Sequence, residues 1–102
     1  MKPTLVSITA LLTLLPAMAG PAYASDPNLG RNLAATCANC HGTNGNTEGI
    51  NVKLAGLDKA TVIKNFKEFK SGEKPATLMH QLAKGYTDAQ LDAIATYFAA
   101  QK

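Results

Sequence analysis

Apolar residues between positions 58 and 98 recur at intervals of three and four, the spacing of one face of an α-helix. The first stripe follows Asp58, a residue suited to an N-cap, and stops at Ser71 and Gly72; its members are Val62, Ile63, Phe66 and Phe69. The last stripe follows Thr87, with Gln90 three residues on in the pattern of a capping box; its members are Leu91, Ile94, Ala95 and Phe98. The two stripes predict two amphipathic helices.

Two shorter segments complete the pattern. Asp26 followed by Pro27 predicts the start of a first helix that runs toward Cys37. Another short helix is expected after Pro75, running through Leu78, Met79 and Leu82 to a C-cap at Gly85. Residues 42–56 are rich in glycine and asparagine and predict a loop. Since no strand pattern is present, the prediction is an all-α fold of about four helices.

Gly30 has a specific place in this prediction. It lies in the first predicted helix, before the two cysteines. A missing side chain at this position would let the first helix cross closely against the last one, near Ile94, Tyr97 or Phe98. The alternative is that Gly30 is only a glycine that the helix tolerates.

The first 24 residues have the features of a cleaved secretory signal. Lys2 precedes an apolar run from Leu5 to Leu15, and the segment ends in the A-x-A pattern of residues 22–24. The run is shorter than the roughly 20 apolar residues that span a bilayer. We therefore expect residues 1–24 to be removed, leaving one domain of residues 25–102 in the periplasm without a membrane span. An uncleaved N-terminal anchor is the alternative.

Size and charge limit the functions available to such a domain. A small domain has a marginal side-chain core, and the expected mature part contains no tryptophan and few aromatic residues. A large apolar cofactor would supply the missing core.

The formal net charge is +3, or +2 without Lys2. Because the basic residues are dispersed, nucleic acid is a poor candidate partner. Some lysines are candidates to steer an acidic partner: Lys53, Lys59, Lys64, Lys67, Lys70, Lys74 and Lys84.

Both cysteines of the chain lie in the stretch CANCHG, with His41 directly after Cys40. A disulfide between Cys37 and Cys40 would close too small a loop to restrain the unfolded chain, and a catalytic dithiol needs a βαβ context. A zinc ion would require His41 to share a tetrahedral site with both thiols, despite adjoining one of them. Cys-x-x-Cys-His fits haem c, with two cysteine thioethers and a histidine on the iron. We therefore predict one covalent haem c held by Cys37, Cys40 and His41.

An electron-carrying haem also needs a second axial ligand. Met79 is the only methionine beyond the expected signal segment, and His80 is its competitor. Neighbouring residues on a helix point in different directions, so only one of the two can ligate the iron. We expect Met79 to be the ligand and His80 to be partly exposed. The residues expected to bury the haem are Leu54, Leu57, Ile63, Phe66, Leu78 and Leu82.

The motif CANCHG, the later Met79 and the final amphipathic helix together resemble class I cytochromes c over roughly residues 28–102. A narrower likeness lies in CANCHGTNGN and in FKSGEKPATLMHQLAKGYTDAQLDAIATYFAAQ. These stretches are similar to the cytochrome subunit of flavocytochrome c sulfide dehydrogenase, a periplasmic enzyme of sulfur-oxidising bacteria. With one Cys-x-x-Cys-His motif, the chain resembles the single-haem form of that subunit.

The resemblance implies a heterodimer with a flavoprotein subunit that carries FAD and oxidises sulfide. This chain would accept electrons from the flavin and pass them to a downstream acceptor, without catalysing the sulfide chemistry itself. The resemblance also implies that Cys37 and Cys40 hold the haem, that His41 and Met79 ligate the iron, and that residues 70–86 shape the Met79 side. Two alternatives stay open: a free-standing periplasmic cytochrome c that shuttles electrons between respiratory or photosynthetic complexes, and a haem enzyme or gas sensor with an open iron site.

Overall fold

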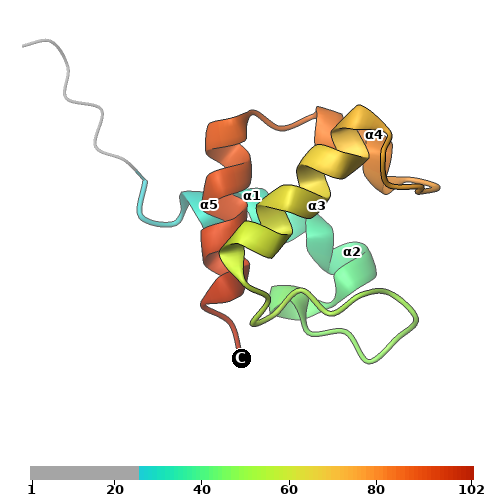
Figure 1. Ribbon diagram of the computed structural model, residues 1–102. Coiled ribbons are helices and arrows are strands. Elements are labelled where there is room, and N and C mark those ends of the chain that lie inside the picture. The colour runs from blue at the N-terminus through green and yellow to red at the C-terminus, as the bar shows by residue number, and fades with distance from the viewer. Residues whose placement is uncertain (1–25) are drawn as a thin grey trace, which may run out of the picture.

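The computed structural model describes residues 26–102, so the predicted signal segment, residues 1–24, lies outside the described residues. The described part consists of helices and loops without a strand (Figure 1). The elements are α1 (Leu29–Ala34), η1 (Ala35–Cys37), α2 (Ala38–His41), η2 (Thr43–Gly45), α3 (Lys59–Ser71), α4 (Met79–Lys84) and α5 (Asp88–Ala99). Because α1, η1 and α2 follow one another without a break, they form one helical unit, and α3, α4 and α5 are three more. The all-α prediction is confirmed.

The two longer helices begin at the residues that the sequence indicates. The Asp58 side chain accepts a hydrogen bond from the backbone N–H of Thr61, which caps α3. That helix ends at Gly72, which has a left-handed φ of 82°. Thr87 and Gln90 form a reciprocal capping box at the start of α5. These local signals are therefore sufficient to define both helices.

The two shorter helices begin later than predicted. The first N-cap is Asn28 and not Asp26, because the Asp26 carboxylate accepts a hydrogen bond from the backbone N–H of Asn28 and so forms a turn before the helix. In the second case α4 begins only at Met79, and residues 75–78 run along the wall of the cavity described below. The end of α4 at Gly85 is confirmed. Residues 42–56 form the predicted loop, apart from the short turn η2.

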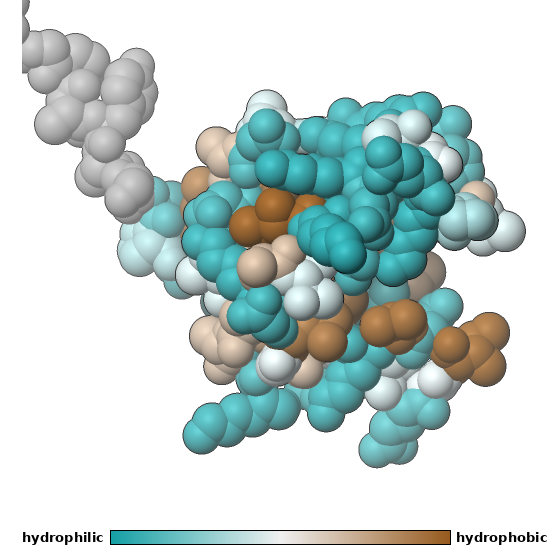
Figure 2. Space-filling model, viewed as in Figure 1, coloured by the Kyte–Doolittle hydropathy of each residue, from teal (hydrophilic) through white to brown (hydrophobic). Residues whose placement is uncertain are grey.

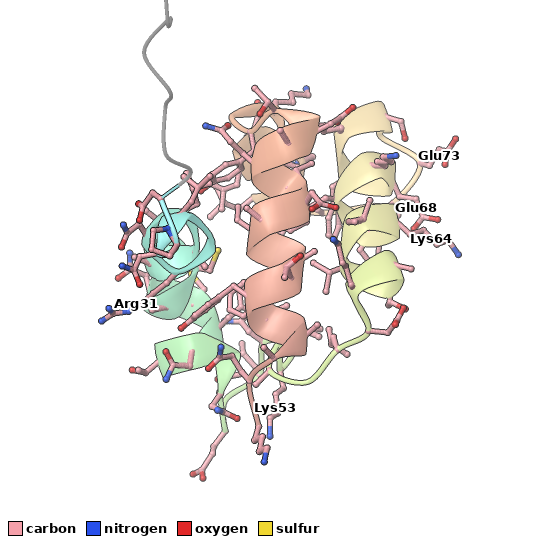
Figure 3. All side chains as sticks on the ribbon, turned by 90° about the vertical axis from the view of Figure 1, so that its left-hand side faces the viewer. Arg31, Lys53, Lys64, Glu68 and Glu73 are labelled. Atoms are coloured by element: carbon pink, nitrogen blue, oxygen red, sulfur yellow. The ribbon has the colours of Figure 1, made fainter. Side chains whose placement is uncertain are left out.

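The core lies where α5 contacts both α1 and α3 (Figures 1 and 3). The predicted stripe of α5 is entirely buried, since none of its four members is more than 1% exposed. The buried residues that pack together are Ala34, Val62, Phe66, Ala83, Leu91, Ile94, Ala95 and Phe98. Within residues 26–102, no helix has the length and apolar character of a membrane-spanning helix.

Gly30 lies at the crossing of α1 and α5. A Cβ atom on Gly30 would lie 2.5 Å from the carbonyl oxygen of Ala93 and 3.1 Å from the Cβ atom of Tyr97. The close approach predicted at Tyr97 is confirmed, and the backbone of Ala93 comes closer still. The two helices could not pack at this distance if residue 30 carried a side chain.

Residues 46–57, which we call the proximal loop, connect η2 to α3 and are fastened to the end of α5 (Figure 1). The backbone N–H of Gly56 donates to the carbonyl oxygen of Phe98 at 2.9 Å. The Asn46 side-chain amide donates to the carbonyl oxygen of Lys102, also at 2.9 Å. The loop therefore has two attachments to the C-terminal end of the chain, and its middle lies beside α2.

Candidate haem site

A cavity of about 560 Å³ lies between the CANCHG segment, the proximal loop, α3 and α4. Its volume falls in the usual range of ligand-binding cavities, and most of its lining is apolar. The apolar side chains are Ile50, Val52, Leu54, Leu57, Val62, Phe66, Phe69, Pro75, Ala76, Leu78 and Leu82. Several of them are exposed at its edge, and Figure 2 shows hydrophobic side chains gathered over the proximal loop. The cavity is thus suited to a large apolar group.

The four residues predicted to hold a haem all line this cavity. Cys37 ends η1, Cys40 and His41 lie on α2, and Met79 is the first residue of α4. The fold therefore brings a compact motif near the start of the domain to the same cavity as a methionine far along the chain.

The two cysteines are not joined by a disulfide. Burial raises the pKa of the Cys37 thiol, and the opposing effect of a hydrogen bond with Thr36 is smaller. A thiol with a raised pKa is protonated at neutral pH, unlike the thiolate of a catalytic dithiol. Within residues 26–102, no three His, Cys, Asp or Glu side chains are grouped as metal ligands. The cysteines are accordingly placed as attachment points for a group inside the cavity.

The imidazole of His41 is oriented by the proximal loop. Its Nδ1 atom lies 2.6 Å from the carbonyl oxygen of Val52, so Nδ1–H is the donor of this hydrogen bond. In the neutral imidazole the other ring nitrogen, Nε2, then carries no proton and can ligate a metal. A second bond, from the Asn51 side-chain amide to the carbonyl oxygen of Cys40 at 2.8 Å, fastens the same loop to the motif.

Gly42 allows the chain to turn directly after His41. Its φ of 80° is in the left-handed region, and a Cβ atom would lie 2.3 Å from the carbonyl oxygen of Asn46. The glycine therefore permits the proximal loop to turn back beside the helix that carries His41.

Met79 and His80 are placed differently. Met79 is half-buried and lines the cavity, whereas His80 is half-buried on α4 and is not among the cavity-lining residues. The Nδ1 atom of His80 is buried without a hydrogen-bond partner. The positions of the two side chains favour Met79 as the axial ligand.

The apolar lining is mostly as predicted. Of the expected residues, Leu54, Leu57, Phe66, Leu78 and Leu82 line the cavity. Ile63 does not, and that prediction is wrong: Ile63 lies on another face of α3, beside Lys64 and Lys67. The face of α3 toward the cavity consists of Val62, Asn65, Phe66 and Phe69, at helical spacing. Asn65 is polar and so does not belong to the apolar stripe that the sequence shows on α3.

Tyr86 is a lining residue that the sequence analysis did not single out. Its hydroxyl lies 3.0 Å from the hydroxyl of Thr36, next to Cys37, and its ring packs edge-on against Phe66. The Tyr86 carbonyl oxygen accepts a hydrogen bond from Lys70. Tyr86 therefore joins the cysteine motif, α3 and the segment before α5 around the cavity.

Three of the lysines considered for steering a partner form ion pairs within the chain. Lys59 pairs with Asp92, Lys64 with Glu68, and Lys70 with Asp88. Figure 3 shows Lys64 beside Glu68 on the outer side of α3, and Lys53 apart from them below. The lysines thus differ in their surroundings and do not form one uniform ring.

These features fit a covalently attached haem. The cavity is large and apolar, and it presents two thiols that are not joined by a disulfide. It also contains the imidazole of His41, whose Nδ1–H donates a hydrogen bond to the proximal loop. Such a bond is usual for a metal-ligating histidine, because it fixes the tautomer and the ring orientation.

Known proteins are similar to this chain over most of its length. The cytochrome subunit of sulfide dehydrogenase from Chlorobaculum tepidum is 36% identical over 69 residues, which are 68% of this chain and 63% of that protein. Cytochrome c4 from Pseudomonas aeruginosa is 38% identical over 97 residues, 93% of this chain and 47% of that protein. Cytochrome c4 from Azotobacter vinelandii is 34% identical over 106 aligned residues, covering 93% of this chain and 50% of that protein.

The matched part of the chain thus spans about half to two thirds of the length of these relatives. The family model described as "Cytochrome c" matches residues 28–102. This match contains the CANCHG motif, the proximal loop, Met79 and all the helices of the described structure. The chain belongs to the cytochrome c family.

Proposed function

We propose that this electron-transfer cytochrome c accepts electrons from the flavin of a sulfide-oxidising flavoprotein and passes them to a downstream acceptor. The observation that carries the proposal is that Cys37, Cys40, His41 and Met79 line one cavity in a chain similar to a sulfide dehydrogenase cytochrome subunit. In this proposal the chain binds one haem c and does not itself catalyse sulfide oxidation.

Each of the four residues has a specific role in the proposed site. Haem c, when bound, supplies a one-electron couple at its iron. Cys37 and Cys40 would hold the group through thioethers, and His41 and Met79 would ligate its iron. With both of these ligands bound, no position would be left for a substrate, which favours electron transfer over the open-site enzyme or gas sensor.

The surroundings of these residues tune the same couple. The hydrogen bond from His41 to Val52 fixes the orientation of the imidazole, and the apolar lining excludes water. Leu78 and Leu82 flank Met79 and are still exposed at the cavity edge, so they lie where a partner can approach. Electron transfer then requires close approach to this edge and no movement of the helices.

The proposed partner is a flavoprotein subunit that carries FAD and forms a heterodimer with this chain. The Chlorobaculum tepidum relative supports it, because its name places it in a sulfide dehydrogenase. The proposed location is the periplasm, which the signal-like residues 1–24 support, since a cleaved signal would direct export. An oxidising compartment outside the cytoplasm also suits a domain whose cysteines must be attached to a cofactor.

A gentle pull-down of this chain from the periplasm of its source organism tests the proposal. The eluate is examined by absorption spectroscopy before and after addition of sulfide. A co-eluting FAD protein, whose flavin bleaches and passes electrons to the haem on sulfide addition, is the expected result. The control is the isolated cytochrome with the same amount of sulfide, which should be reduced much more slowly.

A free-standing electron shuttle is the second candidate function. The two cytochromes c4 favour it, because each aligns over 93% of this chain. A cytochrome that elutes alone, and that sulfide does not reduce through any co-eluting protein, would replace the dehydrogenase proposal with this one.

A further inference from the structure

Lys74 is the only lysine, arginine or acidic residue that lines the cavity in the described part of the chain. It is half-buried and lies just after the end of α3, before the segment that leads to Met79. The remaining lining is apolar, or is polar without a formal charge, apart from the cysteines and His41. Burying a charge is costly unless it is paired, so a single cation in such a wall is expected to have a partner.

The ammonium group of Lys74 is held in place by α3. Its Nζ atom donates a hydrogen bond to the Oδ1 atom of Asn65 at 2.8 Å and lies 5.3 Å from the centre of the Phe69 ring. Asn65 and Phe69 are four residues apart on α3 and both line the cavity. The backbone N–H of Lys74 donates to the carbonyl oxygen of Glu68. Two contacts therefore fix the direction of the side chain, and the third holds its backbone.

Lys74 is not neutralised by an acidic side chain within residues 26–102. The carboxylate of Glu68 pairs with Lys64, and Glu73 is exposed next to Lys74 without an ion pair to it. Lys70 lies near Asp88 and donates to the Tyr86 carbonyl oxygen. The ammonium thus has a neutral amide and an aromatic ring as partners, and can accept an anionic partner.

We propose that Lys74 binds a propionate carboxylate of the haem, with Asn65 as the residue that positions its ammonium group. The inference rests on the proposed haem site. A haem brings two carboxylates to an apolar cavity, and a carboxylate that leaves water needs a charged or hydrogen-bonding partner. Lys74 is the one cationic side chain available to it in the cavity wall. A charge-assisted hydrogen bond between ammonium and carboxylate is about twice as strong as a neutral one.

This contact would also affect electron transfer. The iron carries one more positive charge when oxidised, so a cation fixed near the haem disfavours the oxidised state. When the same cation binds the propionate, it also offsets the negative charge of the propionate, which would otherwise stabilise the oxidised iron. Removal of the Lys74 charge should therefore lower the reduction potential.

The test compares Lys74→Gln with Lys67→Gln in the haem-loaded full chain. Lys67→Gln removes the same single charge. Lys67 is the control because it is an exposed residue on α3 that does not line this cavity. We expect Lys74→Gln to lower the potential more than Lys67→Gln does. Resonance Raman spectra should show a shifted propionate bending band for Lys74→Gln alone, and Lys74→Arg should keep both readouts near those of the parent protein.

Asn65→Ala is a second variant that leaves the charge in place. It should shift the propionate band in the same direction as Lys74→Gln, but less, because the ammonium loses its support. A potential and a band that are the same in Lys74→Gln and Lys67→Gln would overturn the contact while leaving the haem site intact. Absence of covalent haem from the parent protein would overturn the site itself, and the contact with it.

Discussion

The Nδ1 atom of His41 donates a hydrogen bond to the carbonyl oxygen of Val52, eleven residues further along the chain and 2.6 Å away. A carbonyl oxygen can only accept, so this bond determines the tautomer of the imidazole. The nearby bond from Asn51 to the carbonyl oxygen of Cys40 holds the two segments in register. The orientation of the proposed iron ligand therefore depends on a loop as much as on the helix that carries it.

Replacement of Asn51 tests this dependence. Asn51→Ala removes the side-chain donor to Cys40 and should lower the free energy of unfolding of the holoprotein by about 1 kcal/mol, the usual net value of one hydrogen bond. Denaturant unfolding followed by the haem absorption measures it. Asn39→Ala is the control, because Asn39 is exposed on α2 and alanine is a good helix former. Equal stability of Asn51→Ala and the parent protein would contradict the role of this bond.

Met79→Ala tests the second axial ligand. Haem should stay attached through the cysteines, while loss of the thioether opens the iron to carbon monoxide and lowers the potential. A change on the order of 0.1 V is expected, within the ~0.8 V over which axial ligands set haem potentials. Carbon monoxide difference spectra and redox titration provide the two measurements.

His80→Ala is the matched control for Met79, since it alters the adjacent position on α4 but not the cavity lining. It should retain a potential close to that of the parent protein and bind no carbon monoxide. If His80→Ala opened the iron and Met79→Ala did not, the assignment of the two residues would be reversed.

The cysteines are tested by their effect on covalent attachment. The double change of Cys37 and Cys40 to serine should leave no haem with the protein after acid-acetone extraction, because both thioethers are lost. Either single change should leave at most one thioether and an altered absorption spectrum. Haem that resists extraction from the double variant would disprove attachment at these positions.

Gly30→Ala tests the crossing of α1 and α5. The new Cβ atom would lie 2.5 Å from the backbone oxygen of Ala93, so the helices must move apart. Overpacking costs about 1–3 kcal/mol, and alanine returns about 1 kcal/mol of helix propensity. We expect a net loss of about 0–2 kcal/mol in the free energy of unfolding, measured by denaturant titration. Gly49→Ala, in the proximal loop, should change it by less than about 0.5 kcal/mol.

Thr87→Ala tests the capping box of α5. Loss of the hydroxyl that accepts from the Gln90 N–H should cost about 1 kcal/mol in thermal unfolding experiments. Thr96→Ala is the control on the same helix, because the Thr96 hydroxyl only donates to the carbonyl oxygen of Asp92, four residues back. A Thr87 variant as stable as the Thr96 variant would show that packing alone defines this helix end.

The sequence predicts helix starts best where the cap residue is followed directly by a long apolar stripe at helical spacing. Asp58 and Thr87 act as N-caps in the structure, and the motif from Cys37 to His41 and Met79 line a single cavity. The first helix start was misplaced because the Asp26 carboxylate can also form a turn ahead of a helix. Both uses satisfy the same kind of backbone N–H, so sequence alone does not separate them.

Contacts between segments that are distant in the chain are harder to predict from the sequence. Val62 and Ile63 are both apolar neighbours on α3, and only the packing of that helix decides that Val62 rather than Ile63 faces the cavity. Lys74 is one of many dispersed lysines in the sequence, and only the fold brings its ammonium group to Asn65 and Phe69. The sequence cannot indicate that the carbonyl oxygen of Val52 is the acceptor for His41, because every residue has a backbone carbonyl oxygen.

The attachment of the proximal loop to Phe98 and Lys102 has a consequence for the order in which the protein is made. A ribosome completes the CANCHG segment about sixty residues before those anchors exist, because synthesis proceeds from the N-terminus and the mean pace is roughly 5–20 residues per second. The proximal loop therefore cannot make either attachment until residues 98–102 have been synthesised, long after the CANCHG segment.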